Sequence, residues 1–156
     1  MLDIYIVLEY NIHKVNILDK NRQKFTFFSL ASLILGVFIY LILRNDTYFH
    51  AYISEDIKSF FYIQTDKNFF IDFLKYYFID FLWGLSLVSA LNAVSLLNNK
   101  KSILINSIFT IFSGLLFELL QLSGIVNGTF DFIDILMYAV AASIVAVINI
   151  NKFKEY

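Results

Sequence analysis

Two pairs of polar side chains flank a short segment between two long apolar runs. Glu118 and Gln121 lie about one helical turn apart near the end of the first run, and Asp131 and Asp134 begin the second. An ionisable side chain at the centre of a bilayer costs roughly 2.5–3.5 kcal/mol. Residues kept at such a cost serve partner helices, water or a ligand, so these four are the first candidates for a functional site.

The composition indicates the class of protein that carries these residues. Of 156 residues, 59% are hydrophobic and 16% are charged, and the mean hydropathy is +0.69. An ordinary soluble domain has about 45–50% apolar and about 25% charged residues. The net charge of −1 argues against a nucleic-acid partner, which would require a basic face. We therefore predict an all-α integral membrane protein whose main partner is the lipid bilayer.

Four apolar stretches approach the roughly 20 residues that are needed to cross the hydrocarbon of a bilayer. No repeat or linker divides the chain, so we predict a single domain over residues 1–156. The predicted spans are about 25–43, 78–97, 102–122 and 132–150.

Two segments outside the predicted spans are also expected to lie at the membrane surface. Residues 45–77 form the large extracytoplasmic segment, and its aromatic parts at 52–62 and 69–78 predict short interfacial helices. They would form either a cap over the helix ends or a lid that contacts a ligand. Residues 1–18 are apolar enough to lie on the membrane surface, and both helix and strand periods fit them.

Basic residues gather on the side of the chain termini, which predicts cytoplasmic termini under the positive-inside rule. The N-terminus lacks the pattern of a cleaved secretory signal, so the first span should remain as an anchor. We expect a multi-pass membrane protein with both termini in the cytoplasm. The basic residues on the terminal side are Lys14, Lys20, Arg22, Lys24, Lys100, Lys101, Lys152 and Lys154.

Helical spacing places the polar residues on stripes. In the third span the stripe contains Asn106, Thr110, Gly114, Glu118 and Gln121, and in the fourth it contains Asp131, Asp134, Tyr138, Ala142, Val145 and Asn149. For Ser, Thr and Asn, packing between helices is the leading interpretation. Gly84 and Gly114, with Ala141 and Ala142, are expected to let helix backbones approach closely.

The carboxylates need individual interpretations. Asp131 is expected to cap the last span, and Asp80 is a weaker candidate for a cap of the second span. Glu118 lies near the C-terminus of its helix, where the helix dipole disfavours an anion. It should therefore either be protonated through desolvation or face a hydrated pocket that accepts cations. Arg44 and Lys75 are the candidates for an ion pair with Glu118 or Asp134.

The usual catalytic patterns are missing. His13 and His50 are isolated, so no histidine pair has the spacing of a metal site, and no phosphate loop or nucleophile elbow is present. Asp131, Asp134 and Glu118 could together hold a divalent cation through oxygen ligands. We predict no cofactor and no resident metal, and we assign no catalytic residue.

The second half of the chain resembles the VanZ-like family of small bacterial membrane proteins. The resemblance rests on Glu118-x-x-Gln121, a glycine-containing turn and Phe130-Asp131-x-x-Asp134, with the acidic start of the segment around Asp80 and Trp83. It implies a multi-span protein whose founding relatives are linked to glycopeptide-antibiotic resistance. Typical members carry an arginine after the turn glycine, where this chain has Thr129 or Asn127.

Four functions remain open at this point. The first is an outward polar pocket that binds a cell-envelope or lipid-linked ligand. The second is a carboxylate-based membrane enzyme, with or without a divalent ion, that acts on a lipid phosphate. The third is a small proton-coupled transporter in which Glu118 titrates, and the fourth is a structural subunit. The predicted pocket residues are Glu118, Gln121, Asp131, Asp134, Asp80, Trp83 and Tyr138.

Overall fold

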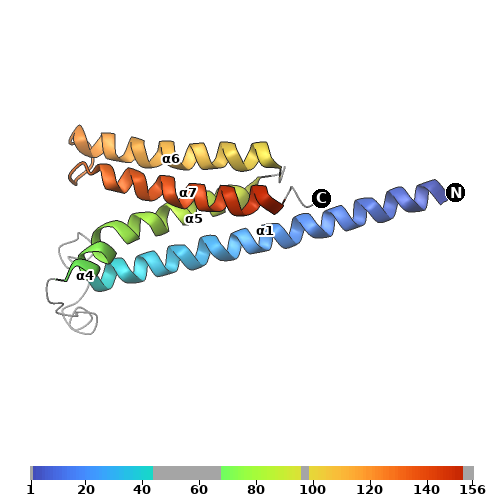
Figure 1. Cartoon of the computed structure of the whole chain (residues 1–156), viewed down its shortest axis with the longest axis horizontal. Coiled ribbons are helices and arrows are strands. Elements are labelled where there is room, and N and C mark those ends of the chain that lie inside the picture. Colours follow the sequence, from blue (N-terminus) through green and yellow to red (C-terminus); the bar gives the residue numbers. More distant parts are fainter. Residues whose placement is uncertain (1, 44–67, 96–98, 153–156) are drawn as a thin grey trace.

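The computed structural model describes residues 2–43, 68–95 and 99–152, and in these ranges it is helical without any strand. Side chains are described for residues 20–43, 68–95 and 99–150. In chain order the elements are α1 (Leu2–Leu43), α4 (Phe69–Phe73), the π-helix η1 (Leu74–Phe78), α5 (Ile79–Val94), α6 (Lys100–Leu122) and α7 (Phe132–Lys152) (Figure 1).

Within the part of the chain that the structure describes, four helical segments are long and apolar enough to cross a membrane: Lys20–Leu43, Phe69–Val94, Lys100–Leu122 and Phe132–Ile150. The prediction of an all-α chain with four candidate spans is confirmed. Large apolar side chains cover the outside of these helices, as a bilayer would require. Phe27, for example, is 68% exposed and Ile108 is 65% exposed.

Residues 2–18 form one continuous helix with the first span, which decides between the helix and the strand that their sequence allowed. At 1.5 Å per residue, the 42 residues of α1 extend about 63 Å, whereas the 23 residues of α6 extend about 35 Å. The N-terminal part of α1 therefore projects beyond the bundle (Figure 1). The interfacial helix predicted at 52–62 falls outside the described residues.

The second span differs from its prediction. We expected an interfacial helix over 69–78 and a new span from Phe78, but the helical backbone continues from α4 through η1 into α5. No glycine or proline interrupts residues 69–83, so no residue in this stretch favours a break. The π-helical turn of η1 joins α4 to α5 within this continuous helix. At the other end α5 stops at Val94, before the predicted boundary.

Helix α5 is the central element, with α1 packed on one side and α6 and α7 on the other (Figure 1). The closest approaches occur at glycines. A Cβ atom built on Gly114 would lie 2.7 Å from Cγ of Tyr138, and one built on Gly84 would lie 3.1 Å from Cα of Tyr138. The predicted close contact at these two glycines is confirmed, and Tyr138 of α7 is the residue that occupies the space.

Small polar side chains join the helices. Ser86 Oγ donates to the carbonyl oxygen of Ser29 over 3.0 Å, which links α5 to α1. Asn106 Nδ2 of α6 donates to Asn92 Oδ1 over 3.0 Å and to Ser95 Oγ over 2.8 Å. These contacts agree with the interpretation that the Ser and Asn side chains serve helix packing.

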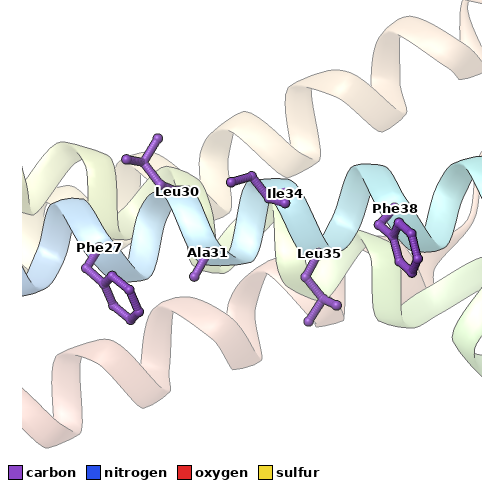
Figure 2. Close-up of a pocket in the computed structure, with 6 residues that line it drawn as sticks. All are labelled: Phe27, Leu30, Ala31, Ile34, Leu35 and Phe38. Carbon is purple, nitrogen blue, oxygen red and sulfur yellow. The ribbon is translucent and has the colours of Figure 1, made fainter.

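An open apolar groove runs along the outer face of α1. It is lined by side chains on successive turns of this helix, and none of them carries a polar group: Phe27, Leu30, Ala31, Ile34, Leu35 and Phe38 (Figure 2). Such a surface suits lipid acyl chains. It does not correspond to the polar pocket that the sequence predicted.

The fit of Tyr138 against Gly114 gives the first testable prediction. Gly114→Ala forces a methyl group against the tyrosine ring, so we expect it to lower the free energy of unfolding by about 1–3 kcal/mol. Gly36→Ala is the matched control, because its Cβ would make an ordinary 3.5 Å contact with Leu82. The control should leave stability unchanged or raise it by up to about 1 kcal/mol. Unfolding in detergent, followed by circular dichroism, measures both. Equal effects of the two substitutions would contradict this assignment.

Candidate functional site

The predicted site residues meet at one end of the bundle. There α5 follows η1, α6 ends and α7 begins, so three helices bring acidic residues together (Figure 1). We call this end, with Asp80, Glu118, Asp131 and Asp134, the acidic end. The structure brings these four residues to the same end of the bundle. Whether they bind a ligand remains a prediction.

The turn between α6 and α7 is set by a glycine C-cap. Gly124 has φ of +72°, its N–H donates to Gln121 O over 2.9 Å, and the N–H of Ile125 donates to Leu120 O over 3.0 Å. This is the Schellman arrangement, which satisfies the last carbonyls of α6 and reverses the chain. Because the turn is short, the C-terminal end of α6 lies beside the N-terminal end of α7.

Gln121 supports the same turn. Gly128 packs so closely on this side chain that a Cβ there would lie 2.7 Å from Gln121 Cδ. Gly128 also has φ of +149°, which a residue with a Cβ rarely adopts. The half-buried Gln121 therefore lies against the turn backbone, which assigns it a role in shaping the acidic end.

Asp131 caps α7, as predicted. Its Oδ1 accepts the N–H of Ile133 over 2.8 Å, which satisfies one of the free donors in the first turn of the helix. The phenol of Tyr77, which lies in η1, is within the electrostatic influence of the same carboxylate. The residue therefore connects the start of α7 to the π-helical turn before α5.

Glu118 is buried where the end of α6 meets the start of α7. It is only 4% exposed, and its Oε2 accepts the backbone N–H of Asp131 over 2.8 Å. The carboxylate thus lies at the N-terminal end of α7, where the helix dipole and free N–H groups stabilise negative charge. The dipole of α6 disfavours an anion at this position, but the dipole of α7 has the opposite sign there and offsets this effect.

Tyr138 lies at the centre of the acidic end. Its ring packs between Gly84 and Gly114, and its hydroxyl is within the electrostatic influence of Asp80, Asp134 and Glu118. Each of these three acids comes from a different helix. Tyr138 was predicted as a pocket residue from helical spacing alone, and the structure places it among the predicted carboxylates.

The structure corrects the expectation for Asp80 in the second span. Asp80 does not begin a free helix, because the helix continues from Phe69, and the actual cap is Asn68, whose Oδ1 accepts the N–H of Phe70 over 3.2 Å. The predicted cap at Asp80 is therefore wrong.

Trp83 is half-buried about one turn further along α5. The Nζ atom of Lys75 lies 5.2 Å from the ring centre of Tyr76, and Arg44 is outside the described residues.

The acidic residues do not form an evident metal site. Among residues 20–43, 68–95 and 99–150, no group of three or more His, Cys, Asp or Glu side chains is arranged so that it could hold a metal ion. The acidic end can instead accept hydrogen bonds, and it presents phenol groups at Tyr77 and Tyr138 as donors. This chemistry suits a polar group that carries its own hydrogen-bond donors.

The contact between Glu118 and Asp131 gives the second prediction. Glu118→Ala leaves a backbone N–H without its acceptor, so we expect a loss of about 1–3 kcal/mol in unfolding free energy and faster hydrogen exchange at the Asp131 amide. Glu118→Gln keeps an acceptor oxygen and should cost less, about 0.3–1 kcal/mol from the lost charge. Exchange rates by NMR in micelles measure the effect. An unaltered Asp131 exchange rate in Glu118→Ala would exclude this role.

Comparison of the chain with protein-family models, with curated proteins and with solved structures gives no match.

Proposed function

We propose that this chain is a VanZ-like integral membrane protein of the bacterial cytoplasmic membrane, whose acidic end binds the polar head of a cell-envelope or lipid-linked ligand. The four apolar helices support a multi-pass arrangement. The basic residues at the opposite end of the bundle favour that end for the cytoplasm under the positive-inside rule. The acidic end then faces outward, with α4 near the membrane interface.

One observation carries the proposal. Carboxylates from α5, α6 and α7 act electrostatically on the hydroxyl of Tyr138, whose ring packs against Gly84 and Gly114. Tyr77 adds a second phenol within the electrostatic influence of Asp131. An acidic side chain inside an apolar bundle is expensive, and such residues mark functional sites in membrane proteins by default. Several acceptors on neighbouring helices match a head group with several donors, such as the hydroxyl groups of a sugar.

The residues of the acidic end have two different roles. Gln121 and Glu118 hold the turn and the start of α7. Asp80, Asp134 and Tyr138 are the residues that we assign to the ligand, with Trp83 at the rim of the site. An aromatic ring beside a carboxylate suits a sugar, which has both an apolar face and hydroxyl groups. The ligand would approach from the bilayer, because the bundle surface around the site is apolar.

A structural role is the second candidate, and one observation favours it. Glu118 and Asp131 both accept backbone N–H groups at the start of α7, which is how acids fasten a helix end. Under this alternative the whole acidic end only joins α6 to α7. Asp80 and Asp134 distinguish the two functions, because neither of them is needed for the caps described above.

The third prediction tests ligand binding with a glycosylated diacylglycerol as the probe. Native mass spectrometry of the full chain in detergent should show a preference for this lipid over a diacylglycerol with the same acyl chains and no sugar. Asp134→Asn and Asp80→Asn should each reduce the preference by roughly tenfold, the loss expected for a hydrogen bond to a charged group.

Asp72→Asn is the matched control, since Asp72 is an exposed acid on α4 whose substitution removes the same charge. It should leave the preference for the glycosylated lipid unchanged. The ligand proposal is wrong if the wild-type protein shows no preference for the glycosylated lipid. It is also wrong if Asp134→Asn and Asp80→Asn both fold normally and keep this preference. In either case the structural function is correct.

A further inference from the structure

The two ends of the bundle carry opposite charges. Acidic residues gather at the end described above, whereas the other end has Lys20, Arg22 and Lys24 on α1 and Lys100 and Lys101 on α6. No charged residue lies between Lys24 and Leu43 of α1, or between Lys101 and Glu118 of α6. The long apolar stretches of these two helices therefore carry no charge, and the lysines lie at their ends.

Contacts within the bundle show that the basic residues of α1 and α6 belong to one end. Arg22 Nε of α1 donates to Ala93 O, in the last turn of α5, over 3.2 Å. Just beyond α5, Ser95 Oγ accepts a hydrogen bond from Asn106 Nδ2 of α6. The C-terminal end of α5 thus lies between residues 20–24 of α1 and the start of α6.

The cations at this end have different roles. Arg22 is used within the fold, where it satisfies a carbonyl near the end of α5. Lys20, Lys24, Lys100 and Lys101 are all exposed, and we call these four the basic rim. A lysine at this depth extends its aliphatic stem along the apolar surface and places its ammonium group among the lipid head groups.

We propose that the basic rim binds anionic phospholipid head groups, so that the protein is surrounded by these lipids at this end of the bundle. Each lysine near an anionic membrane surface gains a favourable interaction with it, and this attraction falls off within a Debye length. The start of α6 adds the positive end of its dipole. This inference is independent of any ligand at the acidic end.

Spin-labelled lipids test the fourth prediction on the full chain in vesicles of phosphatidylcholine. Electron paramagnetic resonance measures the fraction of labelled phosphatidylglycerol, or labelled phosphatidylcholine, that the protein immobilises. We expect the wild-type protein to select phosphatidylglycerol by about fivefold, the factor that corresponds to one lysine at an anionic surface. The variant Lys20→Gln, Lys24→Gln, Lys100→Gln, Lys101→Gln should lose the selectivity.

Two controls separate charge at the rim from other effects. Replacement of the same four lysines by arginine keeps the charge and should keep the selectivity. Lys75→Gln removes a cation from the acidic end and should have no effect. Selectivity that survives in the glutamine variant, or that Lys75→Gln abolishes, overturns the proposal. If the glutamine variant does not fold, the wild-type selectivity must vanish in about 1 M NaCl, where the Debye length is about 3 Å, or the proposal is wrong.

Discussion

The ring of Tyr138 fills the space that two glycines leave, and this contact sets how closely three helices approach. Gly84 of α5 and Gly114 of α6 face the same residue of α7, and a Cβ on either of them would press against it. The packing also has a chemical consequence. It holds the tyrosine hydroxyl among Asp80, Asp134 and Glu118, so the glycines position the site as well as the helices.

Polar groups in the rest of the bundle are satisfied close to where they lie. Asn92 Nδ2 donates to Val88 O over 2.7 Å, and Thr110 Oγ1 donates to Asn106 O over 2.9 Å, each one turn back along its own helix. Because a bilayer supplies no water to such groups, local acceptors are the cheapest solution. The charged residues gather at the two ends, where water and head groups are available. Chemistry specific to this chain is therefore expected at the ends.

Hydropathy and helical spacing were sufficient for much of this arrangement. The limits of the third and fourth spans, the inward stripe through Thr110, Gly114 and Glu118, and the cap at Asp131 follow from local patterns in the chain. The π-helical turn could not be predicted, because the residues of η1 differ little from a regular apolar helix. Asp80 was misassigned for the same reason. We took it for an N-cap because we expected a helix to begin beside it, whereas the helix begins at Phe69.

Glu118 shows why one helix is too small a unit for electrostatic reasoning. Near the end of α6 its charge opposes the dipole of that helix, yet the short turn brings it to the start of α7, where the dipole has the opposite sign. In the VanZ-like pattern that we propose for this chain, an arginine after the turn glycine would be the obvious counter-ion. This chain has Thr129 or Asn127 there, and the backbone N–H of Asp131 supplies the donor instead. A backbone donor therefore fixes the Glu118 carboxylate without adding a cation to the turn between α6 and α7.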